Sequence, residues 1–440
     1  MKIKNAWICQ IENDSIKPVF GNIGFVDGKI TNISETDFYT FDYRPKSEGD
    51  TIDAGGRVLT IPNVNFHDHF YSRLAKGLIL KGPMNNFHNI LKNLWWKVDL
   101  ALDEEIIRAS AQMASMESVR NGVTYIFDHH SSPNFAKNSL NIISDVLKES
   151  DLRGALCFEI TDRNGKAIAE NGINETEEFL ISHLYDENIK SLIGLHASFT
   201  ISNSSLKKAA EIQQKYNCGI HIHLCEDKID SEKSLSRFKK LPAQRLENYA
   251  LLNGKSILAH GIHLNKSDYK IIQKSKSALV FNPDSNMNNA VGLPKFGIIP
   301  NEIPILCGTD GMSSNPPRTL KQLFLLGRLS GMSFESAFKW IQKIYFDQIN
   351  FMKNYFPDFT SLTTGDRADF IIWDYIPPTP FVSENFWGHF IYGILERPVY
   401  SVVQKGKVLM NNFQLTKDFA EYNKNVKEQG NRLFKSLLNK

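Results

Sequence analysis

The chain has 440 residues, of which 42% are hydrophobic and 22% are charged, and its formal net charge is +3. This is the composition of an ordinary globular protein, long enough for one large domain and a smaller one. Because acids and bases are mixed along the chain, we expect neither a nucleic-acid nor a membrane partner. The sequence has no run of about 18 apolar residues, so we predict no transmembrane helix.

The N-terminus and the cysteines indicate the cellular compartment in which we expect the protein. The segment MKIKNAWICQIENDS turns polar before any apolar stretch of signal-peptide length, so we expect no export. The five cysteines lack CxxC spacing and predict neither a disulfide framework nor a cysteine zinc site. A reduced, cytoplasmic setting is the simpler prediction. The cysteines are Cys9, Cys157, Cys218, Cys225 and Cys307.

Both ends of the chain are typical of short strands separated by turns. In KPVFGNIGFVDGKITNI, the Asp27–Gly28 pair between two apolar runs predicts a hairpin. Near the other end, DFIIWDY and VYSVVQKGKVLMNN have the same character. We therefore predict one small β-sandwich domain built from both termini, comprising residues 1–56 and 361–440.

The middle of the chain, residues 57–360, alternates short apolar runs with helical patterns. The clearest helical pattern, ALDEEIIRASAQMASMESVRNG, has an acidic start that suits the helix dipole, and Gly122 can end it in the left-handed conformation. Eight strands alternating with helices predict an α/β fold, a (β/α)₈ TIM-type barrel. The candidate strands are 58–64, 124–127, 154–158, 192–195, 219–224, 257–258, 278–281 and 303–307.

The last residues, EYNKNVKEQGNRLFKSLLNK, predict an amphipathic helix. Its apolar face ends in Leu433, Phe434, Leu437 and Leu438. Such a face usually docks on a domain surface. We group this helix with the terminal β domain.

Two pairs of histidines follow candidate barrel strands. The segment NFHDHFY places His67 and His69 after the first strand. Side chains two residues apart in an extended segment point to the same side, so both imidazoles can reach one ion. In HIHLCE, His221 and His223 share a face after the fifth strand, and Glu226 follows. Either pair alone is also compatible with ordinary core or loop histidines.

Two further polar residues follow later strands. His260 lies in AHGIH at the end of the sixth strand, and Asp310 lies in CGTDGMSSN after the eighth. An Asp before a Gly is usually a turn residue. Their joint placement with the histidine pairs matters more, because a (β/α)₈ barrel carries its active site at the carboxyl ends of its strands. Imidazoles with one carboxylate suit zinc or ferrous iron better than magnesium or calcium.

The order HxH, HxHxxE, a later histidine and GTDG resembles the amidohydrolase superfamily, in its metal-dependent deaminase and chlorohydrolase branch. Further segments, among them LWWKVDLALDEE, FEITDRNG and FNPDSNMNNAVG, are similar to the SsnA-type aminohydrolases of that branch. The similarity spans about residues 50–410. It implies one divalent metal ion, zinc or alternatively ferrous iron, held by His67, His69, His223 and Asp310.

The resemblance also implies roles for residues around the metal. Glu226 would shuttle a proton, His260 would orient the attacking water, and Asp310 would act in catalysis as well as in metal binding. His196, in HASFT, corresponds to a histidine that contacts substrate in related deaminases. His221 would support a metal ligand from behind rather than bind the ion itself.

The remaining strand ends supply candidate substrate contacts. Glu159 and Arg163, in FEITDRNG, follow the third strand, and Asn286 could read the edge of a heteroaromatic ring. A polar loop is the alternative for each. Many relatives have a histidine where this chain has Phe281, so we expect Phe281 to alter the pocket above the metal. The tryptophan pair of LWWKVD could form a lid that stacks on a planar ring.

Together these features predict a metal-dependent aminohydrolase. It would deaminate an aminated nitrogen heterocycle of the purine, pyrimidine, pterin or triazine type with metal-activated water. Two alternatives stay open: hydrolysis of a cyclic amide or another C–N bond, and a non-catalytic accessory role linked to selenium-dependent hydroxylases. The expected partner is a small heterocyclic substrate, and a homo-oligomer also stays open because relatives are often oligomeric.

Overall fold

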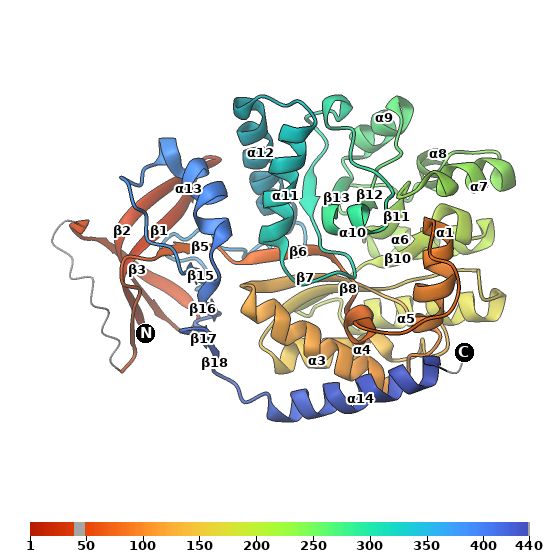
Figure 1. The fold of residues 1–440 in the computed structure, drawn as a ribbon, viewed down its shortest axis with the longest axis horizontal. Helices are drawn as coiled ribbons and strands as arrows, with labels where there is room; N and C mark the ends of the chain where they lie inside the picture. Colours follow the sequence, from red (N-terminus) through yellow and green to blue (C-terminus); the bar gives the residue numbers. More distant parts are fainter. Residues whose placement is uncertain (39–48, 439–440) are drawn as a thin grey trace.

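The computed structural model describes residues 1–38 and 49–438. Two parts of the predictions, residues 39–48 of the N-terminal segment and the last two residues of the C-terminal helix, lie outside this range. Figure 1 shows a β domain made from both chain ends beside a larger barrel. Within the described residues, none of the helices combines the length and the apolar character that a membrane crossing requires.

Nine strands from both ends of the chain form one hydrogen-bonded sheet. They are β1 Lys2–Glu12, β2 Ser15–Val26, β3 Lys29–Glu35, β4 Thr51–Asp53, β5 Val58–Thr60, β15 Phe370–Trp373, β16 Val399–Gln404, β17 Lys407–Asn411 and β18 Gln414–Leu415. The order is β18-β17-β16-β15-β5-β1-β2-β3, and β4 pairs with β1. The predicted hairpin is confirmed, because Asp27 and Gly28 join β2 to β3 with φ of 49° and 76°.

The barrel strands are parallel and come from the middle of the chain. They are β6 Asn63–Asp68, β7 Val123–His130, β8 Arg153–Phe158, β9 Ile189–Ser191, β10 Ile193–Ala197, β11 Ile220–Leu224, β12 Ile257–His260, β13 Ala278–Phe281 and β14 Ile305–Cys307. Pairing runs through β6-β7-β8-β9 and β10-β11-β12-β13-β14. Only Leu192 separates β9 from β10, so the two form the fourth barrel strand. Backbone bonds from Ile160 to Gly194 (3.1 Å) and from Asp310 to His67 (2.9 Å) close the ring. The predicted TIM-type barrel is confirmed.

One predicted barrel strand, residues 58–64, is divided between the two sheets. Its first part is β5, which pairs with β1 and β15 in the terminal sheet, and its last part begins β6. Pro62 lies between them and has no N–H to donate to a strand ladder. The barrel therefore begins at Asn63 and not at residue 58.

Helices surround the barrel, and α3 is the long helix that the sequence predicts. Asp103 caps its first turn by accepting a hydrogen bond from the Ile106 amide at 3.1 Å, and Gly122 follows its end with φ of 68°. The helices are α1 Phe87–Ile90, α2 Trp96–Asp99, α3 Glu104–Arg120, α4 Ser139–Glu149, α5 Lys166–Ser182, α6 Asn203–Tyr216, α7 Lys228–Phe238, α8 Pro242–Asn248, α9 Lys266–Ser275, α10 Pro283–Asn288, α11 Pro316–Leu329, α12 Phe334–Met352, α13 Phe386–Tyr392 and α14 Ala420–Leu438.

The C-terminal helix α14 packs against α3 on the outside of the barrel (Figure 1). Leu433 and Leu437 of the predicted apolar face are buried there, and the Tyr422 hydroxyl donates to Glu149 at 2.6 Å. The helix thus lies with the barrel, whereas the prediction grouped it with the terminal β domain. An amphipathic pattern specifies which face is buried but not which surface buries it.

Candidate active site

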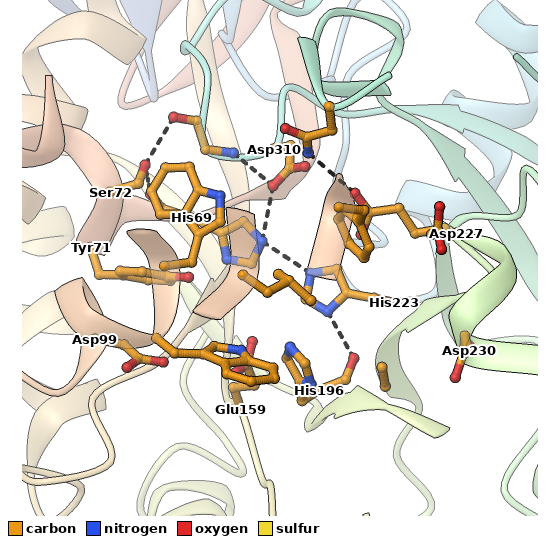
Figure 2. Close-up of a pocket in the computed structure, with 18 of the residues that line it drawn as sticks. His69, Tyr71, Ser72, Asp99, Glu159, His196, His223, Asp227, Asp230 and Asp310 are labelled. Carbon is orange, nitrogen blue, oxygen red and sulfur yellow. Dashed lines mark hydrogen bonds and ion pairs between the residues drawn. The ribbon is translucent and has the colours of Figure 1, made fainter. Parts of the chain in front are cut away.

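A pocket opens at the carboxyl ends of the barrel strands (Figure 2). It encloses about 680 Å³, counting the solvent at its mouth. Of the residues predicted from the sequence, it is lined by His69, Glu159, His196, His223, Glu226 and Asp310.

His67 and His69 lie close to Asp310, and His223 lies against His69. The Nε2 atom of His69 lies 3.1 Å from Nε2 of His223 and 3.1 Å from Oδ1 of Asp310 (Figure 2). The Nε2 atom of His67 lies 3.9 Å from the same oxygen and has no hydrogen-bond partner. Around a tetrahedral zinc ion with bonds of about 2.1 Å, ligand atoms are about 3.4 Å apart. The two contacts of His69 are close to this spacing. The ligand atoms of His67, His69 and Asp310 lie within 4.8 Å of one another, as do those of His67, His223 and His260.

The far sides of two of these rings are fixed by backbone carbonyls. Nδ1 of His69 donates to the carbonyl oxygen of His129 at 2.6 Å, and Nδ1 of His223 donates to that of His196 at 2.8 Å. A carbonyl oxygen only accepts, so each Nδ1 carries a proton and each Nε2 turns its lone pair toward the other ring. Such lone pairs repel unless a cation lies between them. A proton satisfies only two of the converging groups, whereas a metal ion satisfies all four.

His67 is oriented by another histidine. Its Nδ1 lies 2.8 Å from Nε2 of His221, and both rings are fully buried. His221 thus lies behind His67, while His223, two residues along β11, reaches the site itself. This arrangement supports the prediction that His221 positions a ligand and does not bind the ion.

Burial also sets the charges of the ligands. It lowers the pKa of His67 and of His223 well below the ordinary value, and neighbouring histidines lower both further. These two rings are therefore neutral and able to bind a cation. Burial alone would raise the pKa of Asp310, but the hydrogen bond and charge of His69 hold that pKa well below its usual range. Burial opposes protonation of His69, yet Asp310 raises its pKa to about 9, which shows how strongly the site favours a positive charge.

Glu226 and His260 lie next to the candidate metal ligands. The Nε2 atom of His260 is 3.5 Å from Oε2 of Glu226 and 3.8 Å from Oδ2 of Asp310. Burial, followed by the charge of Asp310, raises the pKa of Glu226 well above its usual range. The Asn289 amide donates to the same carboxyl group at 3.4 Å. Glu226 is therefore a proton-carrying group directly beside the converging ligands.

The backbone at two strand ends is left-handed where it presents these groups. His260 has φ of 74° and Asp310 has φ of 54°. This conformation is uncommon for residues other than glycine, and such strain concentrates at functional sites. Asp310 lines the pocket, and His260 lies behind it, 3.8 Å from its Oδ2 atom.

Two predicted substrate contacts lie elsewhere. Asn286 does not line the pocket but accepts a hydrogen bond from Nδ1 of His260 at 2.9 Å. Phe281 is only 1% exposed, and its ring packs toward Trp340 of α12, with centroids 6.5 Å apart. Side chains alternate between the two faces of a strand, and Phe281 occupies the outer face. The prediction that Phe281 faces the pocket is therefore wrong, and Asn286 acts through His260.

Glu159 lines the pocket as predicted, whereas Arg163 lies behind it. The guanidinium of Arg163 donates from Nη1 to Glu159 at 2.9 Å and forms a second ion pair with Asp99. Its side chain is 8% exposed and is not part of the lining. The ring of His196 does line the pocket, and its Nδ1 lies 2.7 Å from the Thr200 hydroxyl.

Several lining residues were not predicted as site residues. Asp99 and Tyr71 line one side, and Asn289 lies beside Glu226. Asn289 ends the same NMNN run that contains Asn286, so a scan of the whole run would have included it. Both tryptophans of LWWKVD line the pocket.

Comparisons with known proteins agree with this geometry. The model of the amidohydrolase family matches residues 60–409. The 5'-deoxyadenosine deaminase of Methanococcus aeolicus is 28% identical over 396 residues, covering 88% of this chain and 89% of that protein. The 5-methylthioadenosine/S-adenosylhomocysteine deaminase of Thermoanaerobacter pseudethanolicus is 24% identical over 442 residues and covers 98% of both chains. A zinc-bound adenosine deaminase from Xanthomonas campestris has a similar fold, with a TM-score of 0.80 at 18% identity over 98% of both chains.

Proposed function

Because the chain belongs to the amidohydrolase family, we propose that it is a zinc-dependent aminohydrolase that deaminates an aminated nitrogen heterocycle. The observation that carries this proposal is the buried carboxyl of Glu226, 3.5 Å from His260 and directly beside the proposed metal ligands. Among purines, pyrimidines, pterins and triazines, an adenine-type base is the first choice. Two relatives that span nearly the whole chain are named as deaminases of adenine nucleosides.

The metal would be held by His67, His69, His223 and Asp310. Three imidazoles and a carboxylate suit zinc, with ferrous iron as the alternative. When bound, such an ion lowers the pKa of a water molecule from about 15.7 to about 7 and so supplies a nucleophile at neutral pH.

Three side chains of the protein would handle the protons. Glu226 donates its proton to the ring nitrogen next to the carbon that carries the amino group, which makes that carbon more electrophilic. His260 and Asp310 lie on one side of the site and hold the attacking water by hydrogen bonds. The water proton then passes through a carboxylate to the amino group, which leaves as ammonia.

An apolar wall would hold the planar ring. The pocket is also lined by Phe87, Leu91, Trp95, Trp96 and Phe199. Phe87, Leu91 and Phe199 belong to a small hydrophobic cluster separate from the main core, and the two tryptophans pack against it. Aromatic side chains stack on heteroaromatic rings and exclude water from them. The wall therefore suits a flat base whose polar edge faces Glu226.

Ammonia release by the zinc-loaded protein tests the proposal. Adenine nucleosides are assayed first, followed by aminated pyrimidines, pterins and triazines. We expect the product to carry a carbonyl oxygen in place of the amino group. Gain of water without ammonia would favour opening of a cyclic amide instead. If no compound releases ammonia or gains water, the proposal is contradicted.

A further inference from the structure

We infer that the pocket selects heterocycles whose substituents are uncharged or cationic, and discriminates against those that carry a carboxylate or a phosphate. This inference rests on the proposed function, because it concerns the substrate of the same site. Among the described residues that line the pocket, none is Lys or Arg. Six of them are acids; besides Glu226 and Asp310, which serve the proposed proton transfer and metal binding, these are Asp99, Glu159, Asp227 and Asp230.

The guanidinium of Arg163 lies behind the pocket but is not available to a substrate anion. It is paired with two carboxylates, those of Asp99 and Glu159. The ring of Trp96 also covers it, with 5.3 Å between the guanidinium carbon and the ring centroid. One cation shared by two acids leaves no unpaired side-chain charge in this wall for a substituent, and a desolvated anion without a partner binds poorly.

The same side of the pocket offers acceptors instead of donors. Figure 2 shows Asp99 and Glu159 across the pocket from Asp310. Asp99 is 1% exposed, and its Oδ1 atom has no hydrogen-bond partner. A bare carboxylate oxygen in a pocket wall accepts from an N–H or O–H group and repels an anionic oxygen. The structure therefore favours substituents that donate hydrogen bonds at this point.

The N-terminus of α7 also borders the pocket. Helix N-termini ordinarily favour anions, because their free N–H groups and the helix dipole attract negative charge. Here Asp227 occupies that position and accepts from the Ile229 amide at 2.9 Å. Asp230 accepts from the amides of Cys225 and Phe199 at 2.9 and 3.2 Å. The protein's own carboxylates have taken the place that a substrate anion would use.

Matched pairs of compounds with the same heterocycle test the inference. Adenosine is compared with adenosine 5'-monophosphate, and cytidine with cytidine 5'-monophosphate. The zinc-loaded wild type gives kcat/KM from ammonia release, and the zinc-loaded Glu226→Gln variant gives binding from ligand-induced thermal stabilisation. We expect roughly tenfold or greater preference for the uncharged member of each pair.

Asp99→Asn identifies the cause of the preference. This isosteric change removes one of the two carboxylates that neutralise Arg163, so we expect the preference to fall by roughly threefold or more. Asp14→Asn, in a turn of the terminal sheet, is the matched control and should leave the preference unchanged. Lys233→Met removes an amine that lies 5.3 Å from the Phe199 ring, outside the lining, and should also leave it unchanged.

The outcomes separate this inference from the proposed function. Equal or better use of the phosphorylated members, or no preference in either measurement, would overturn the inference. An unchanged preference in Asp99→Asn would overturn the role assigned to the acidic lining. If no compound releases ammonia but the uncharged members still bind more tightly, the proposed function fails while charge selection is supported.

Discussion

The Nε2 atoms of His69 and His223 face each other at 3.1 Å, while the opposite nitrogen of each ring is bonded to a backbone carbonyl. Neither ring can turn away without losing its carbonyl bond. The pair therefore requires a positive charge between the rings, and Asp310 lies where it completes the site. This relationship joins the fold to the chemistry, because His69 directly follows β6 and His223 lies in β11, on the opposite side of the barrel.

Removing one ligand should remove the metal. In His223→Ala we expect zinc affinity to fall by at least roughly tenfold and ammonia release by at least roughly 100-fold, because an incomplete site neither holds the ion nor activates water. Elemental analysis after dialysis against a chelator measures the first effect. His183→Asn changes a histidine at the C-terminal end of α5, outside the barrel, and serves as the control. Full zinc content in His223→Ala would contradict the assignment.

Asn286 should act through His260 and not through the substrate. Asn286→Ala leaves Nδ1 of His260 without its acceptor, so we expect kcat to fall roughly 10- to 100-fold with little change in KM. Asn286→Asp keeps an oxygen at the same place and should retain more activity, since Nδ2 of Asn286 has no partner to lose. Asn288→Ala, an exposed site on the same helix, is the control. If KM rises while kcat is unchanged, Asn286 contacts the substrate after all.

The buried carboxyl of Asp230 should make stability fall as the pH rises. Burial raises its pKa from 3.8 to about 6, against the hydrogen bonds from Cys225 and Phe199 that lower it. The folded protein thus binds this proton more tightly than the unfolded chain, and the stabilisation is complete below about pH 4 and lost as the pH passes 6. Relative to Asp230→Asn, the free energy of unfolding of the wild type should fall by about 2 kcal/mol between pH 4 and 7.

Urea denaturation of both metal-free proteins measures this difference. The variant keeps only one acceptor oxygen for two amide donors, which adds an offset that does not depend on pH. A difference that stays constant from pH 4 to pH 7 would contradict the assigned pKa.

The contact between α14 and α3 should contribute to stability and not to catalysis. Leu433 is fully buried on α14, so Leu433→Ala should lower the free energy of unfolding by about 2–5 kcal/mol. Lys427→Ala changes an exposed residue of the same helix and should stay within about 0.5 kcal/mol of the wild type. Thermal and urea unfolding compare the two variants. Equal stability of both would show that the helix is not docked as described.

The sequence predicted the parts of the molecule that depend on simple periodicities. The two-residue repeat placed His67 and His69 on one side of an extended segment, and the barrel rule brought them to the same end as His223 and Asp310. Both follow from local geometry and from the parallel topology, which requires no knowledge of side-chain packing.

The substrate side of the site was predicted less well. The faces of Phe281 and Asn286 depend on where β13 ends and α10 begins, and a shift of one residue reverses the side to which a side chain points. The pairing of Arg163 with Asp99 joins residues far apart in sequence, and no local pattern indicates it. Pro62 cannot donate a hydrogen bond to a strand ladder. The sequence therefore contains a signal that the barrel strand begins after it.

The most direct test of the central claim compares the zinc-loaded wild type with Glu226→Gln in water labelled with heavy oxygen. We expect the wild type to release ammonia from an aminated heterocycle and to place one labelled oxygen in the product. Glu226→Gln should keep its zinc and lose roughly 10²–10⁴-fold in rate, because only the proton-carrying group has changed. Full ammonia release by Glu226→Gln with zinc bound, or release without labelled oxygen in the product, would contradict the account.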